Sequence, residues 1–293
     1  MARGYELDDI RRKIIDLLQT IPSGLSGVEV AKRLDMNRIT TVKYLSMLST
    51  EGMIVQRNVG NVTIWLSAPG ITNFDFPVDY QKDVPYFRDH VLNCSFDDVR
   101  GLIKSCVHEG ASILNIMTEI IIPCSETIKT LALDGKIGYT EEALFVNMII
   151  DSIKMTEQSL PNTDVNKNIC LLATDTFGLI LAESSATVLR SMGWNVFLIG
   201  DISSELLLEL DLRKLLSNIW SQRQGIMIIS GFSDDDDGLV FLDKIVNSTR
   251  TEAWSDVRFT VCSSANQHKP KADLVVESLG SLIQWIDTIS LNK

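Results

Sequence analysis

The sequence predicts a multidomain α/β protein with an N-terminal α+β domain, a helical bundle, and a doubly wound five-stranded parallel sheet. Three observations predict it. Residues 8–50 contain three segments with apolar residues at helical spacing. Apolar and polar residues then alternate over residues 54–66. Residues 87–160 keep a helical period, and residues 165–293 alternate short β-branched runs with helical segments. A chain of 293 residues has room for two or three such domains.

Two helices are expected at the start of the chain. Residues 8–21 carry isoleucine and leucine at helical spacing, and a proline and a glycine follow. Ser26 stands three residues before Glu29. This spacing is typical of a capping box, in which each side chain accepts a hydrogen bond from the other residue's backbone N–H. The pair predicts a short second helix over residues 28–34.

A third helix is expected over residues 38–50, with Asn37 as its N-cap and Gly52 as its stop. Only a tight turn separates it from the second helix. Its apolar stripe predicts which side chains face the core. They are Val42, Leu45 and Leu48.

After Gly52 the pattern changes to period two. Residues 54–59 and 62–66 read as strands, and the Gly-Asn pair between them favours a β-hairpin. Three helices with a tight second turn, followed by a hairpin, is the order of elements in a winged helix-turn-helix domain. We therefore predict such a domain, suited to binding double-stranded DNA, over residues 1–72.

The whole chain carries a net charge of −11, which disfavours binding to nucleic acid. The charge is unevenly distributed. Residues 1–68 hold nine Lys and Arg against seven Asp and Glu, a balance of +2, whereas the rest holds 18 against 31, a balance of −13. A DNA-binding role is therefore expected of the N-terminal domain.

Residues 34–45, with Leu48 and Gly52, resemble the helix-turn-helix of archaeal and bacterial winged-helix regulators. A helix in the major groove needs hydrogen-bond donors in its first turns, and the third helix has them. The hairpin would reach phosphates or the minor groove. The expected DNA contacts are Arg38, Thr40, Thr41, Lys43, Tyr44, Arg57, Asn58 and Asn61. The alternative is a winged helix used only for protein contact or dimerisation.

The middle of the chain predicts a linker and then helices. Residues 73–86 contain two prolines and little periodicity, which is typical of a linker. Helical patterns over residues 96–109, 110–133 and 141–160 predict a four-helix bundle within residues 87–164.

Residues 165–293 predict the parallel sheet, because continuous apolar strands alternate with helices. The expected strands are residues 169–173, 195–199, 225–230, 258–262 and 274–276. The expected helices are residues 179–192, 204–219, 239–249 and 280–291.

Several segments of the C-terminal half resemble the helical cap plus cobalamin-binding domain of light- and cobalamin-responsive repressors and of methionine-synthase-type corrinoid modules. They are residues 121–143, residues 169–183, the element Gly193-Trp-Asn-Val-Phe-Leu-Ile-Gly200 and Ile228-Ile-Ser230. The resemblance covers residues 87–293. It implies a cap followed by a flavodoxin-like sheet with a ligand at the carboxyl edge.

The residues at the family's cobalamin-contacting positions are mostly different. Gly178 stands at the position of the cobalt-binding histidine, and Thr176 at that of the loop aspartate. In the cap, an alanine replaces the tryptophan and only Glu142 of a Glu-His pair remains. We therefore expect no bound cofactor, and another small-molecule effector or none. The ligand pocket implied by the resemblance consists of Glu142, Asp175, Thr176, Phe177, Gly178, Ser230, Ser263 and Ser264.

No catalytic motif or metal site is indicated. The five cysteines are odd in number and widely spaced, which predicts buried thiols, with a redox pair as the alternative. The three histidines are too scattered for a triad. Haem or another tetrapyrrole, with His108, Cys106 or Cys124 as axial ligand, is a further alternative. The acidic run at residues 234–237 is expected to be a solvated loop, or else a cation site.

The sequence thus favours a DNA-binding transcription regulator, not an enzyme, with a sensor or oligomerisation domain that forms a homodimer or higher oligomer. The runner-up is a cobalamin- or haem-responsive regulator with altered ligation. A third hypothesis is a corrinoid protein accessory to methyl transfer. No apolar run approaches the ~18 residues of a membrane span, so a cytoplasmic protein without a membrane partner is expected.

Overall fold

The computed structural model describes residues 7–21, 23–59, 62–68, 80–157, 161–202, 214–215, 217–218, 225–249, 257–263 and 270–291. The chain divides into two compact units, Met1–Ala111 and Ser112–Lys293. The division falls inside the segment expected to form a four-helix bundle, so its first helices belong to one unit and its last to the other. None of the described helices is both long and apolar enough to cross a membrane.

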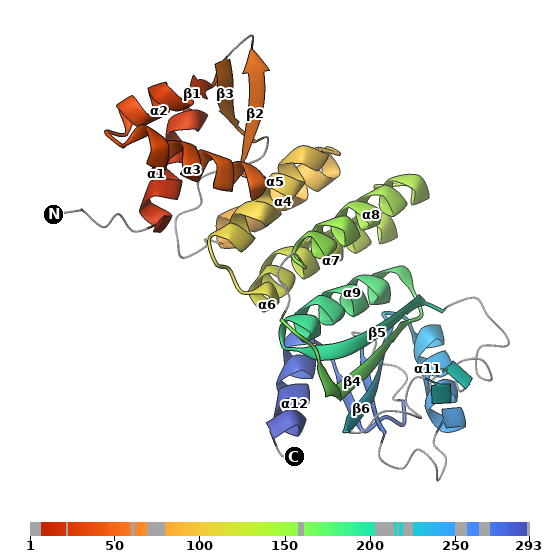
Figure 1. Ribbon diagram of the computed structural model, residues 1–293. Helices are drawn as coiled ribbons and strands as arrows, with labels where there is room; N and C mark the ends of the chain where they lie inside the picture. Colours follow the sequence, from red (N-terminus) through yellow and green to blue (C-terminus); the bar gives the residue numbers. More distant parts are fainter. Residues whose placement is uncertain are drawn as a thin grey trace. The chain divides into compact units, whose positions relative to one another are not determined.

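The N-terminal unit begins with three helices and a small antiparallel sheet (Figure 1). These elements are α1 (Leu7–Gln19), β1 (Leu25–Ser26), α2 (Gly27–Arg33), α3 (Arg38–Thr50), β2 (Ile54–Val59) and β3 (Val62–Ser67). The strands pair in the order β1-β3-β2, with Val59 opposite Val62 in the hairpin. The centre of the core is formed by Ile10, Ile14, Leu18, Leu45, Leu48 and Trp65.

The helix ends form as the sequence predicts. Both hydrogen bonds of the capping box between Ser26 and Glu29 are present. Asn37 Oδ1 accepts from the Ile39 N–H at 2.9 Å. Gly52 ends α3 with a φ of 76°, in the left-handed region that a glycine adopts without a steric cost.

The buried face of α3 differs by one residue from the prediction. Thr41 is 0% exposed, whereas Val42 is 41% exposed. Thr41 precedes Leu45 by four residues and Leu48 by seven, so the three side chains share one helical face. Its hydroxyl donates to the Asn37 carbonyl at 3.1 Å. The predictions that Val42 faces the core and that Thr41 contacts DNA are therefore wrong.

Two further helices, α4 (Tyr80–Leu92) and α5 (Phe96–His108), pack against each other within the N-terminal unit. α4 begins inside the segment expected to be a linker, and Pro85 lies within it. Phe87 and Val91 are four residues apart and both fully buried. Their burial stabilises a helical turn that local sequence alone disfavours.

The C-terminal unit starts with α6 (Ile113–Asn115), the π-helical segment η1 (Ile116–Ile121), α7 (Ile122–Leu133) and α8 (Tyr139–Met155). Pro123 at the start of α7 explains the wider π-helical turn before it. Its ring would clash with the carbonyl four residues earlier in a regular α-helix, and it has no N–H to donate. Such segments often lie at functional sites.

A parallel five-stranded sheet follows, with the strand order β5-β4-β6-β7-β8. The strands are β4 (Asp164–Ala173), β5 (Trp194–Asp201), β6 (Ile226–Phe232), β7 (Arg258–Cys262) and β8 (Leu274–Val276). The helices are α9 (Thr176–Ser191), α11 (Asp236–Thr249) and α12 (Leu279–Leu291). The sheet therefore has the five predicted strands, all parallel.

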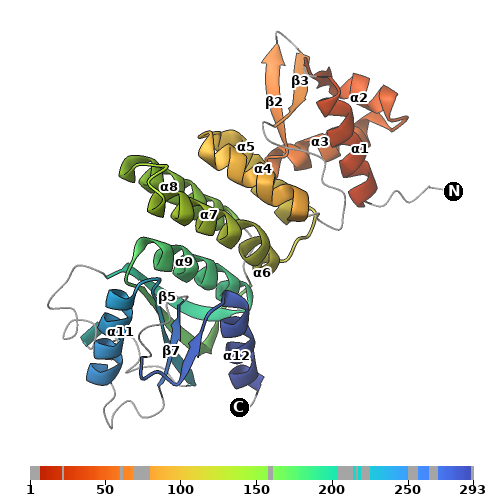
Figure 2. The same cartoon turned by 180° about the vertical axis from the view of Figure 1, so that it is seen from behind.

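Helices cover both faces of this sheet (Figures 1 and 2). α9 packs on β4, β5 and β6 and also contacts α12, whereas Leu239, Leu242 and Ile245 of α11 join Cys170 and Leu172 in a core on the opposite face. This is the doubly wound arrangement expected from the alternating pattern. The helix expected over residues 204–219 lies almost entirely outside the described residues.

Candidate functional site

The carboxyl edge of the sheet is organised by Asp175, which follows β4 and caps α9. Its Oδ1 accepts from the Gly178 N–H at 2.6 Å. Its Oδ2 accepts from the Asp234 N–H at 2.7 Å and the Ser233 hydroxyl at 3.1 Å. Burial raises the pKa of the Asp175 carboxyl, although these hydrogen bonds favour its charged form. Asp175 thus joins the loop after β4 to the loop after β6.

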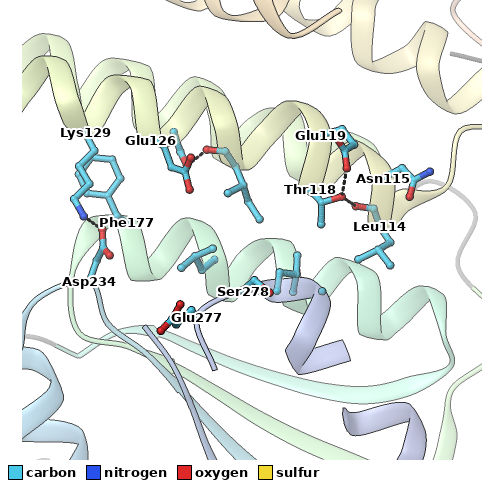
Figure 3. Close-up of a pocket in the computed structure, with 15 residues that line it drawn as sticks. Leu114, Asn115, Thr118, Glu119, Glu126, Lys129, Phe177, Asp234, Glu277 and Ser278 are labelled. Carbon is cyan, nitrogen blue, oxygen red and sulfur yellow. Dashed lines mark hydrogen bonds and ion pairs between the residues drawn. The ribbon is translucent and has the colours of Figure 1, made fainter. Parts of the chain in front are cut away.

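A pocket of about 460 Å³ lies beside this edge (Figure 3). One wall comes from α6, η1 and α7, and the other from the start of α9 and the turns before α11 and α12. It is lined by Leu114, Asn115, Thr118, Glu119, Ile122, Ser125, Glu126, Lys129, Phe177, Leu181, Asp234, Glu277, Ser278, Leu279 and Gly280. The volume is in the range of small-molecule sites.

Lys129, Phe177 and Asp234 gather at one end of the pocket (Figure 3). The Lys129 ammonium forms an ion pair with the Asp234 carboxylate. It also lies 5.9 Å from the centre of the Phe177 ring. Asp234, the first residue of the acidic run, is therefore a half-buried pocket residue and not part of a solvated loop.

Among the residues that the resemblance placed in a ligand pocket, only Phe177 lines this one. Ser230 is fully buried in the sheet, where its Oγ accepts from the Thr260 hydroxyl at 2.8 Å. β6 continues to Phe232, two residues beyond the predicted end, so Ser230 lies within the strand and not at its carboxyl end. Ser263 is 2% exposed. These serines are therefore not pocket residues.

The remaining predicted residues do not meet in one site. Thr176 is exposed at the start of α9 and Glu142 is half-buried in the first turn of α8, and neither lines the described pocket. Ser264 lies outside the described residues. The lining residues of η1, α7 and α12 were not predicted, because no local sequence pattern indicates that these segments lie close together.

The surroundings of Gly178 show whether the C-terminal unit has room for the cobalt-binding histidine of the cobalamin-binding family. A Cβ added to Gly178 would lie 2.7 Å from the Phe232 carbonyl oxygen, so the backbones leave no room for a side chain at the position of the family's histidine. None of the described residues lining the pocket is histidine, cysteine or methionine. No group of three His, Cys, Asp or Glu among the described residues is placed to hold a metal ion. The residues present do not fit a cobalamin ligated in the family's manner.

A second candidate site is the exposed surface of α3 and the hairpin. Arg38, Thr40 and Lys43 are exposed. Tyr44 is half-buried against the core of the unit, which leaves it less available than predicted. Two apolar side chains that the sequence did not assign to this surface, Ile39 at 81% and Val42 at 41%, are exposed beside these polar residues.

Two of the three hairpin residues predicted to contact DNA are among the described residues. Arg57 and Asn58 are exposed on β2. Asn58 Oδ1 accepts from the Thr63 hydroxyl on β3 at 3.1 Å, which orients its amide at the surface. Asn61 lies outside the described residues.

Comparison with known proteins identifies the fold of part of the chain. No protein-family model and no curated protein matches it. Among solved structures, the monomethylamine corrinoid protein of Methanosarcina barkeri is similar with a TM-score of 0.54 and 12% identity, covering 72% of this chain and 98% of that one. The chain thus contains a fold of the cobalamin-binding type, as the sequence predicted.

Two other solved structures match less well. The methanol:cobalamin methyltransferase complex of Methanosarcina barkeri has a TM-score of 0.33 and 15% identity, covering 72% of this chain and 81% of that chain. A cobalamin-binding protein from Desulfitobacterium hafniense has a TM-score of 0.35 and 11% identity, covering 72% of this chain and 98% of that chain.

Proposed function

We propose that the protein is a sequence-specific DNA-binding transcription regulator whose N-terminal unit contains a winged helix-turn-helix. One observation carries the proposal: the first turns of α3 expose Arg38, Thr40 and Lys43, while the opposite face of the same helix is buried. Arginine and lysine donate to guanine and phosphate, and threonine can donate to either. The exposed Ile39 and Val42 supply apolar contacts suited to thymine methyl groups.

The hairpin supports the same interface. In this class of domain the wing lies beside the recognition helix and meets the DNA backbone. Arg57 and Asn58 offer a cation and an amide on β2. A balance of only +2 over residues 1–68 gives weak attraction to DNA for one copy. We therefore propose that the protein acts as a homodimer on paired half-sites, and that its C-terminal unit holds a small-molecule effector in the pocket.

The proposal is tested with a duplex enriched by the full chain from a random-sequence pool. Fluorescence anisotropy of that duplex should show that Arg38→Ala weakens binding by about 5-fold to 150-fold, the range for losing a base contact. Arg100→Ala is the matched control, because Arg100 is an exposed arginine of α5 in the same unit. Unchanged binding by Arg38→Ala, or equal losses in both variants, would remove α3 from the interface.

A further inference from the structure

The pocket of the C-terminal unit has a strongly acidic rim. Glu119, Glu126, Asp234 and Glu277 line it, and Lys129 is the basic residue among its described lining, so these side chains carry a formal charge of −3. Lys129 balances Asp234. The three glutamates have no cationic partner among the described side chains. Their charge repels anions and attracts cations.

A competing preference comes from the N-terminus of α12, where Leu279 and Gly280 line the pocket. A helix N-terminus carries about half a positive charge and favours anions. Glu277 precedes this helix by two residues and supplies a full negative charge at the same place. The N-terminus of α9 is already capped by Asp175. The carboxylates therefore outweigh the helix dipoles.

The pocket already holds an ammonium group, which is an observation independent of the glutamates. The Lys129 ammonium lies between the Asp234 carboxylate and the Phe177 ring (Figure 3). A carboxylate together with an aromatic face is a favourable setting for an organic cation. This end of the pocket is thus chemically suited to a ligand cation as well as to the lysine.

Large aliphatic side chains also line the pocket, alongside five small or polar residues. They are Leu114, Ile122, Leu181 and Leu279. An apolar surface of this kind favours a ligand with a hydrocarbon body. We infer that the effector pocket binds an organic cation, an amine or quaternary ammonium compound with an apolar body. Only its effect on DNA rests on the proposed function, since binding to the pocket does not require DNA.

Three probes with one hydrocarbon body test the inference on the full chain by calorimetry. They are cyclohexylmethylammonium, cyclohexylmethanol and cyclohexanecarboxylate. We expect the cation to bind at least about tenfold more tightly than the alcohol, the equivalent of ~1.4 kcal/mol, and the anion to bind least. A neutral or anionic probe that binds as tightly as the cation would overturn the inference. So would the absence of binding by the cation.

Substitutions of lining residues then test whether the cation binds in this pocket. The sign of the change in affinity distinguishes a cation site from an anion site. Lys129→Met should strengthen cation binding, because it removes the ammonium group that competes with the ligand for the Asp234 carboxylate and the Phe177 ring. A site built for an anion would instead lose its cation and bind the anion more weakly. Glu126→Gln and Glu277→Gln should each weaken cation binding by about twofold to fivefold, the range for exposed charges. Asp287→Asn, an exposed acid of α12 away from the pocket, is the matched control.

Two results of the variant series would contradict the inference. One is weaker cation binding by Lys129→Met in a protein with an unchanged circular dichroism spectrum. The other is an equal effect of Asp287→Asn and Glu126→Gln. Because these assays contain no DNA, a result that contradicts the cation site leaves the DNA-binding proposal unaffected, and the two can be distinguished.

Discussion

Gly178 lies in the first turn of α9, where the helix backbone passes close to the end of β6. We expect Gly178→Ala to lower the free energy of unfolding by about 1–3 kcal/mol, because its methyl group would overlap the Phe232 carbonyl. Urea denaturation measures the change. Gly280→Ala is the control: a Cβ there meets nothing within 4 Å, so the free energy of unfolding should stay the same or rise by up to ~1 kcal/mol. Similar losses in both variants would contradict the close approach.

Buried thiols should make the free energy of unfolding fall at alkaline pH. Burial raises the pKa of Cys170 to about 12, whereas an unfolded thiol ionises near ~8.5. Between these values the unfolded state releases its proton first, so the free energy of unfolding falls as the pH rises from about 9 to about 12. Burial also raises the pKa of Cys106 and Cys262 to about 12.

Cys170→Val tests this directly, because valine has no proton to release. The difference in the free energy of unfolding between variant and wild type should be constant from about pH 6 to 8. Above about pH 9 it should shift in favour of the variant by about 1.4 kcal/mol per pH unit. Urea denaturation at pH 7 and pH 10 is sufficient. Parallel curves for the two proteins up to pH 10 would contradict the raised pKa.

Single residues also show how far the candidate sites could be predicted from sequence. Exposed cations in the first two turns of α3 were predicted from residue type and position, and Arg38 and Lys43 are exposed. Thr41 was assigned wrongly because a one-residue change in helical phase decides whether a threonine is buried. Glu277 was missed because the turn before α12 and the helix α7 meet only through the tertiary fold.

At the scale of elements, the sequence predicted regular patterns well. The bounds of α3, β7 and β8 match the structure residue for residue, because caps, glycines and β-branched runs mark them clearly. The helical region was expected to start at residue 87, whereas α4 starts at Tyr80, because prolines dominate the local signal there while burial of Phe87 and Val91 acts over a longer range. The π-helical turn of η1 was not predicted, since its residues have an ordinary helical pattern.

At the scale of the whole molecule, the charge is divided as the proposed function requires. The N-terminal segment has a balance of +2 in a chain of −11. This small excess of cations would favour DNA at that segment, while the rest of the chain, with a balance of −13, would repel phosphate. The acidic pocket belongs to the other unit, so the proposed ligand and the proposed DNA site would use separate surfaces of the chain.

DNA selectivity of the full chain tests the central claim most directly. Anisotropy titrations compare the duplex enriched from a random pool with a scrambled duplex of the same length and composition at near-physiological salt. We expect the enriched duplex to contain two related half-sites and to bind at least about 10³-fold more tightly than the scrambled one. Equal affinity for the two duplexes, or no binding to either, would contradict the claim that this chain is a sequence-specific regulator.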